Sequence, residues 1–364
     1  MKVELIRDLS NAFGPSGFEE EVVRAIAKHT KGYAIAHDAM LNTYIRKPKN
    51  EGRSIVVQLD AHLDECGFMV QSVQDDGTLS IVTLGGFHPT NLPAHTVLVR
   101  NRKGELHRGI IAAKPVHFMT EQERASQQIA IETLQVDVGT TSREETEQVF
   151  GIAPGDPIVP DVVFDYNEQT GVCFGKAFDN RAGCACIIDT MDKVFAEGAE
   201  EPPVTVVGAF AAQEEVGMRG AKVTAQVVKP DLAIVFEGSP SDDFFVAVSQ
   251  AQGRMKEGAQ IRLFDKSYIS NIAFVHIAEQ VAQELQIPIQ KAVRRGGSTN
   301  AGVISLTEKA VPTLVIGVPS RYVHSHYNYC ALSDLEAASD LAAAVIAALD
   351  EETVRHILRQ DILV

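Results

Sequence analysis

The chain has 364 residues. A single hydrophobic core is usually too small for a chain of this length, so two domains are expected. Its formal net charge of −15, from 33 basic and 48 acidic residues, disfavours electrostatic binding to nucleic acid or to an anionic membrane surface. No apolar run approaches the length of a membrane span, and the N-terminus mixes both charge signs without a hydrophobic signal core. These features favour a cytoplasmic, globular protein that binds neither nucleic acid nor membrane.

The N-terminal third contains a helix signal and a strand signal. Ser16 and Glu19 have the spacing of a capping box and precede an apolar face at helical period, which predicts a helix over 17–29. The β-rich run at 54–59 predicts a strand. It ends just before the segment Ala-His-Leu-Asp-Glu at 61–65.

The pattern of secondary-structure signals changes between residues 70 and 165. Short β-type runs alternate there with turn signals such as Asp-Asp-Gly at 75–77, which predicts a compact β-rich domain. Because this stretch separates residues 61–65 from the later motifs, we interpret 70–165 as an insertion. The catalytic domain is then discontinuous, formed by residues 1–69 and 166–364.

After residue 165, strand and helix signals alternate. Helices are predicted at 182–197, 270–285 and 333–349, and strands at 204–210, 231–236 and 312–317. Alternation of this kind predicts an α/β fold with a mainly parallel sheet flanked by helices.

The five cysteines do not indicate a disulfide framework, because their number is odd and their density is low in a long chain. Cys184 and Cys186 are separated by one residue, whereas zinc and redox pairs typically have two intervening residues. They lie in an apolar stretch with helical character, so we expect buried or bystander thiols.

Side chains that commonly bind metals follow most of the predicted strands. His62, the pair Glu214 and Glu215, Glu237, and His324 each follow one strand, and Asp179 opens the helix that begins near Arg181. Ligands in open α/β sheets bind beyond the carboxyl ends of the strands, so one sheet edge can gather all of them. Two histidines with several carboxylates would hold two divalent cations, which activate water for hydrolysis.

Each of these motifs also has a simpler interpretation when it is taken alone. Asp179 is the kind of residue that caps a helix, and an adjacent pair of glutamates is usually a solvated loop. It is the coincidence of five segments at one sheet edge that favours a metal site.

Five stretches resemble, in order along the chain, those of the M42 family of metallo-aminopeptidases, which includes glutamyl aminopeptidases and the tetrahedral (TET) enzymes. They are Gly-Pro-Ser-Gly-Phe-Glu-Glu at 14–20, Ala-His-Leu-Asp-Glu-Cys-Gly-Phe at 61–68, Lys-Ala-Phe-Asp-Asn-Arg-Ala-Gly at 176–183, Gln-Glu-Glu-Val-Gly-Met-Arg-Gly-Ala at 213–221 and Arg-Tyr-Val-His-Ser at 321–325. Together they span nearly the whole chain and are highly specific.

The resemblance implies a role for each metal-type residue. Asp179 would bridge two cations, Zn²⁺ or Co²⁺, through its two carboxylate oxygens. His62 and Glu237 would complete one site, while Glu215 and His324 would complete the other. Glu237 departs from the family pattern, in which Asp is frequent at this position; the longer side chain still supplies a carboxylate.

Two further carboxylates would act on catalysis without binding metal. A hydrolytic site of this kind needs a general base that is not a ligand. Residue chemistry alone leaves open which of Glu214 and Glu215 fills that role; the resemblance assigns Glu214 as the base. Asp64 lies two residues from His62, on the same strand face, and would orient its imidazole.

Substrate preference is less constrained by the sequence. Arg254, Lys256 and Arg262 would favour acidic N-terminal residues if they lined the pocket, and are otherwise surface charges or structural ion pairs. The loop at 296–301 resembles the family's Gly-Gly-x-Thr-Asp-Ala loop, with Asn300 in place of Asp. His326 would either donate to a substrate oxygen or serve a structural role.

The resemblance also implies partners. Substrates would be short peptides with a free N-terminus, and the β-rich insertion resembles the family's dimerisation domain. A dimer-based homo-oligomer is therefore expected, which in TET enzymes is a hollow twelve-subunit tetrahedron. Two alternatives stay open: a dimetal deacylase or other amidohydrolase, and a non-catalytic family member that keeps the metal.

Overall fold

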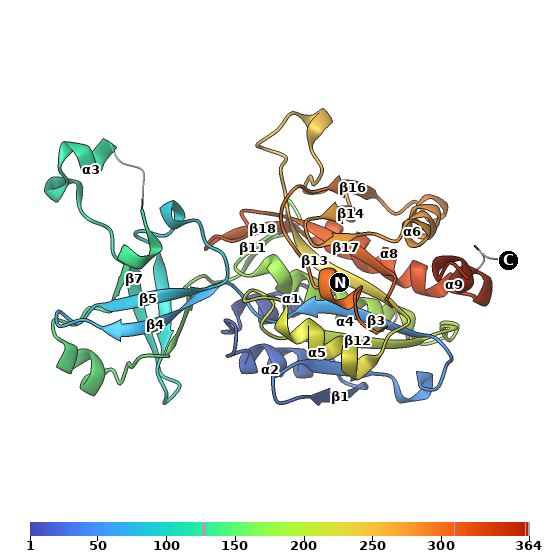
Figure 1. The fold of residues 1–364 in the computed structure, drawn as a ribbon, viewed down its shortest axis with the longest axis horizontal. Helices are drawn as coiled ribbons and strands as arrows, with labels where there is room; N and C mark the ends of the chain where they lie inside the picture. Colours follow the sequence, from blue (N-terminus) through green and yellow to red (C-terminus); the bar gives the residue numbers. More distant parts are fainter. Residues whose placement is uncertain (126–128, 309, 361, 363–364) are drawn as a thin grey trace.

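The computed structural model describes residues 1–125, 129–308, 310–360 and 362 (Figure 1). A large sheet flanked by helices forms one part of the molecule, and a closed β-barrel projects from it to the left in Figure 1. In the described part of the chain, no helix is long and apolar enough to span a bilayer.

Four adjacent strands at the centre of the large sheet are parallel. In spatial order they are β12 (Thr205–Ala211), β3 (Val56–His62), β13 (Leu232–Pro240) and β17 (Thr313–Arg321). Most residues of these strands are buried, as expected for parallel strands that are covered on both faces. The predicted strands at 54–59, 204–210, 231–236 and 312–317 are confirmed, each shifted by one or two residues at its start and extended at its carboxyl end.

The outer strands make the sheet mixed, because those next to the parallel centre pair antiparallel with it. β1 (Ala34–His37) and β2 (Thr43–Arg46) extend it beside β12, and β18 (Asn328–Ala331), β11 (Val172–Gly175) and β10 (Asp165–Asn167) extend it beyond β17. β14 (Ala259–Asp265) pairs antiparallel with β17 and with β15 (Tyr268–Ile269), and parallel with β16 (Ile289–Val293). The predicted α/β class is confirmed.

Helices cover both faces of the sheet. Alternate residues of β13 show the two faces, since Ile234 and Phe236 belong to one apolar cluster and Ala233 and Val235 belong to another. On the first face lie α1 (Val3–Asn11), α2 (Glu20–His29), α4 (Phe178–Val194), α6 (Ile272–Glu284), α8 (Leu332–Ala347) and α9 (Glu351–Ile357). On the second face lie α5 (Arg219–Val228) and α7 (Ala301–Ile304).

The predicted helices at 182–197, 270–285 and 333–349 correspond to α4, α6 and α8, and the helix predicted over 17–29 corresponds to α2. α2 begins three residues later than predicted, because Ser16 does not cap it. The Ser16 hydroxyl instead donates to the Asp64 carboxylate at 2.6 Å. The sequence signals do not predict α1, α5, α7 and α9, nor the short helix at Glu121–Ala125.

The inserted β-rich domain is a closed barrel of six antiparallel strands. In spatial order these are β4 (Gly67–Val73), β5 (Leu79–Leu84), β8 (Gln135–Asp137), β7 (Leu106–Ile111), β6 (Thr96–Arg100) and β9 (Pro157–Pro160). Its apolar core, which includes Phe68, Val97 and Ile158, is separate from the cores around the large sheet. The short helix α3 (Glu121–Ala125) lies far from the sheet, in the connection between β7 and β8 (Figure 1).

Short helical turns complete the elements. The 3₁₀ turns lie at Pro48–Asn50, Pro89–Asn91, Val116–Phe118, Ile131–Thr133 and Val248–Gln250, and a π-helical turn lies at Glu145–Val149.

A buried ion cluster joins the N-terminal segment, the end of β3 and the start of α4. The Glu65 carboxylate accepts hydrogen bonds from Lys176 Nζ at 2.5 and 2.6 Å and from Arg181 Nη2 at 3.3 Å. Arg181 also donates to the backbone carbonyls of Leu9, Ala12, Gly14 and Leu63. All three charged side chains are almost fully buried, so this cluster fixes segments that are far apart in sequence.

Replacing Lys176 by Met should lower the free energy of unfolding by about 3 kcal/mol, because it leaves the buried Glu65 carboxylate without its main partner. Urea denaturation monitored by circular dichroism measures the change. Lys28→Met is the matched control: Lys28 is exposed and pairs with Glu4 and Asp8, so its loss should cost less than about 1 kcal/mol. Equal destabilisation by the two substitutions would contradict the structural role of the cluster.

Candidate metal centre

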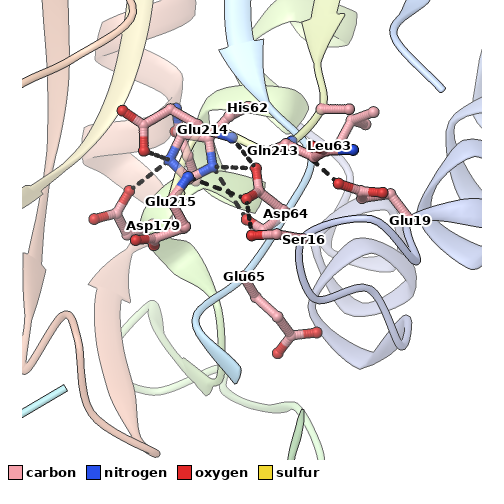
Figure 2. Close-up of polar contacts among 12 residues, drawn as sticks. Ser16, Glu19, His62, Leu63, Asp64, Glu65, Asp179, Gln213, Glu214 and Glu215 are labelled. Atoms are coloured by element: carbon pink, nitrogen blue, oxygen red, sulfur yellow. Dashed lines mark hydrogen bonds and ion pairs between the residues drawn. The ribbon is translucent and has the colours of Figure 1, made fainter. Parts of the chain in front are cut away.

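The metal-type residues predicted from the sequence meet at the carboxyl edge of the parallel strands. His62 is the last residue of β3, and Glu214 and Glu215 follow the end of β12. Glu237 lies inside β13 rather than after it, and His324 follows β17. Figure 2 shows the side chains that surround His62.

Asp179 lies between the two histidines. Its Oδ1 is 3.1 Å from His62 Nε2, and its Oδ2 is 3.3 Å from His324 Nε2. The backbone of Asp179 and Asn180 is not helical, so the regular part of α4 begins at Arg181, and Asn180 donates to the carbonyl of Phe236 at 2.9 Å. Burial opposes ionisation of Asp179, but the hydrogen bonds from His324 and His62 hold its pKa well below the usual range.

Asp64 lies behind His62 and fixes the loop that carries the two glutamates. His62 Nδ1 is 3.1 Å from the Asp64 carbonyl and 3.4 Å from its Oδ1. The same carboxylate accepts the backbone N–H groups of Glu214 at 2.8 Å and Glu215 at 3.1 Å (Figure 2). Burial alone would raise the pKa of Asp64, but the hydrogen bond from His62 and that from Ser16 lower it.

The remaining carboxylates lie close together and have few positively charged or hydrogen-bonding partners. Glu214 Oε2 and Glu237 Oε1 lie 3.9 and 4.0 Å from His62 Nε2. Burial, with the neighbouring carboxylates, raises the pKa of Glu214 to about 8 and that of Glu215 to about 7. Burial and the Asp179 charge also raise the pKa of Glu237 well above its usual range. Glu237 Oε2 is buried without a hydrogen-bond partner among the described residues.

Two groups of side chains have the spacing to hold a cation. His62, Asp179 and Glu237 form one group, and Cys66, Glu215 and His324 form the other; within each group the ligand atoms lie within 4.8 Å of one another. Buried carboxylates that repel each other, together with an orphaned carboxylate oxygen, fit a site built for positive charge. These side chains therefore fit divalent cations.

Several neighbours of the site were not identified from the sequence. The Glu19 carboxylate is buried and accepts the backbone N–H groups of Gly17 at 2.9 Å and Gln213 at 3.1 Å. Burial and the charge of Asp64 raise its pKa to about 7. From the barrel, the turn after β5 reaches the centre, where the Gly86 carbonyl lies 2.7 Å from His324 Nδ1. The sequence signal for Glu19 is its position in the 14–20 motif, but the spacing of Ser16 and Glu19 predicts a helix cap instead.

Other residues singled out in the sequence have structural surroundings. Asn300 donates to Asp60 at 2.7 Å, and Arg262 is buried, where it donates to Ser239 at 2.7 Å. Arg254 forms an ion pair with Glu257 at 3.3 Å.

His326 also has structural surroundings. It is buried and its ring stacks on that of His95, with ring centres 4.4 Å apart. Burial and His95 lower the pKa of His326 to about 3. All five cysteines are free thiols, and all but Cys66 are buried.

Comparison with known proteins identifies the family of this chain. The family model of the M42 glutamyl aminopeptidases matches residues 42–341. The chain belongs to the M42 family. It is 30% identical to the glutamyl aminopeptidase of Lactococcus lactis over 354 residues, which cover 97% of this chain and 98% of the relative.

Solved structures of the family share the fold. The TET aminopeptidase from a marine sediment archaeon, Thaumarchaeota archaeon SCGC AB-539-E09, matches with a TM-score of 0.92 and 36% identity over 97% of this chain and 98% of its own. PhTET1-12s, a dodecamer, matches with a TM-score of 0.83 and 26% identity over 96% of this chain and all of its own. This M42 chain is a peptidase that hydrolyses peptides at the N-terminus.

Replacing Gly238 by Ala should disturb the position of Asp179. A Cβ at Gly238 would lie 2.5 Å from the Asp179 Cα, and Gly238 lies in β13 directly after Glu237. We expect a roughly 100-fold loss of aminopeptidase activity, since displacement of a catalytic group by about 1 Å costs this much. Gly296→Ala, where an added Cβ meets nothing within 4 Å, is the control and should match the wild type. Similar activities for the two variants would contradict the prediction.

The metal-free protein should lose stability as the pH rises from about 5 to about 8. The pKa values of Glu214 and Glu215 are raised in the folded state, so their stabilising contribution is complete below the unfolded value of 4.5 and is lost as these groups ionise. The raised pKa of His324 acts in the same direction. Melting temperatures of chelator-treated protein measure the effect, which Glu214→Gln should reduce and added Zn²⁺ should reverse. A melting temperature that rises over this range would contradict it.

Proposed function

We propose that this M42 aminopeptidase removes N-terminal residues from short peptides at a centre of two divalent cations, Zn²⁺ or Co²⁺. The observation that carries the proposal is Asp179, because each of its carboxylate oxygens faces a different imidazole. A carboxylate in this position is suited to bridge two cations. His62 and Glu237 would then hold one cation, and Glu215 and His324 the other.

When bound, the two cations would polarise the scissile carbonyl and make the attacking water more acidic. Asp64 would keep the His62 imidazole in the tautomer whose Nε2 lone pair is free for a cation, because its carbonyl and carboxylate face Nδ1. His324 is oriented in the same way by the Gly86 carbonyl.

We assign Glu214 as the general base. It belongs to neither of the two groups with metal-ligand spacing, although it lies at the same centre and its backbone is anchored by Asp64. In the metal-free protein, burial and the neighbouring carboxylates raise the pKa of Glu214 to about 8. Bound cations would lower this pKa, so that Glu214 is ionised and able to accept a proton near neutral pH. Glu214 would accept a proton from the attacking water and return it to the leaving amine.

For the chain as a whole, we propose a catalytic domain of residues 1–69 and 166–364 and a dimerisation domain of residues 70–165. The barrel and its connection expose large apolar side chains, which supports contact with a second copy: Leu106, Ile110, Val116 and Phe118. We further propose that such dimers assemble into a larger homo-oligomer, the twelve-subunit particle of TET enzymes, in the cytoplasm.

Glu214→Gln should lower kcat about 100- to 10,000-fold while leaving the metal content unchanged, because an amide cannot accept the proton. Glu215→Gln should instead reduce the amount of bound cation. A panel of aminoacyl chromogenic amides, assayed after chelation and again after addition of Zn²⁺ or Co²⁺, measures the first effect, and elemental analysis measures the second.

Glu132→Gln, an exposed residue of the barrel, is the control and should behave as the wild type. If the metal-loaded wild type cleaves no member of the panel but cleaves N-acyl amino acids, a deacylase takes the place of this proposal. If it cleaves neither class of substrate, a non-catalytic metal-binding role replaces the proposed function.

A further inference from the structure

Cys66 is the one cysteine in contact with the candidate metal centre. Its thiol lies between the end of β3 and the barrel turn at Gly85 and Gly86. Its Sγ, a ring nitrogen of His324 and a carboxylate oxygen of Glu215 all lie within 4.8 Å of one another. The four other cysteines are buried elsewhere, in α4, β11 and β18. Cys66 is partly exposed, and none of the roles assigned above uses it.

Cys66 shares one small cavity with three residues of the second cation position. This cavity, of about 20 Å³, is lined by Cys66, Asp179, Glu215 and His324. The rest of its lining is the Lys176–Glu65 ion pair, in which the two charges compensate each other, with Pro160, Ala177, Ser325 and Asn328. A volume of this size holds about one water-sized sphere, which suits a single ion. The donor side chains therefore surround a space that a cation can fill.

The barrel turn allows the thiol and a carboxylate to approach each other closely. Gly85 has φ +92°, and a Cβ at this residue would lie 2.8 Å from Cys66 Sγ and 2.9 Å from Glu215 Oε2. A larger residue at this position would push both groups away. Because Gly85 has no side chain, the Cys66 sulfur and the Glu215 carboxylate can both face the same small cavity.

We propose that Cys66 is a fourth protein ligand of the second cation, beside Asp179, Glu215 and His324. The proposal rests on the proposed function, because it concerns the same dimetal centre. As the sulfur forms its bond to the cation, the S–H bond breaks and the proton passes to solvent. The sulfur electron pair then completes a set of one thiolate, one imidazole and two carboxylates.

The two cation positions would then differ in chemistry. The first has three protein donors, His62, Asp179 and Glu237, and so keeps an open coordination position, as catalytic zinc sites do. The second has four protein donors including sulfur, which favours a soft cation such as Zn²⁺. The thiolate thus makes the second position the more zinc-selective of the two.

Titration of metal-free protein with Co²⁺ tests the proposal by its absorption spectrum. Ligation by sulfur gives an intense near-ultraviolet thiolate-to-cobalt charge-transfer band, whereas histidine and carboxylate ligands give only weak visible bands. We expect the near-ultraviolet band in the wild type and in the control Cys173→Ser, whose thiol lies in β11. Cys66→Ser should lose this band and keep the visible ones.

Zinc affinity gives a second measurement. In competition with a chromophoric chelator, Cys66→Ser should bind one of its two zinc ions about tenfold or more weakly than the wild type and the other equally well. Visible cobalt bands without the near-ultraviolet band in the wild type would overturn the thiolate ligand and leave the proposed function intact. A near-ultraviolet band that persists in Cys66→Ser would also overturn it. If no Co²⁺ binds at all, both the ligand and the dimetal function are wrong.

Discussion

The concentration of negative charge at one edge of the sheet is the constraint on which the rest of the structure depends. Asp179 and three glutamates share a buried space with only two imidazoles near enough to form hydrogen bonds or ion pairs with them among the described residues. Two unit charges about 4 Å apart repel by about 4 kcal/mol near a protein surface. Such a site persists only when cations enter it or the carboxylates take up protons, and when the surrounding scaffold is rigid enough to hold them together.

The scaffold meets this requirement with backbone groups and buried ion pairs rather than with additional positive charges at the centre. Asp64 and Glu19 accept hydrogen bonds from backbone N–H groups of the loop at 213–215. The backbone that carries the two glutamates of this loop is therefore held in place. The cluster around Glu65 places the start of α4, and with it Asp179, against the end of β3. Both devices act on the main chain, which leaves the carboxylates free to face a ligand.

The sequence predicts those parts of the site whose positions follow from strand order. His62, Glu215 and His324 come together because parallel strands end at the same edge, and this holds whatever the details of the loops. Contacts that depend on a loop path were not predictable. Ser16 has the spacing of a helix cap but bonds Asp64, and Cys66 meets His324 across 258 residues through a turn of the barrel. The antiparallel edge strands escaped prediction because they are short and lie outside the alternating pattern.

The carbonyl of Gly86 connects the barrel to the His324 side chain at the edge of the sheet. It lies within hydrogen-bond distance of His324, so the donor strength of that imidazole depends on where the barrel sits. The position of the barrel and the electronic character of the His324 imidazole are thereby connected by a single turn of glycines.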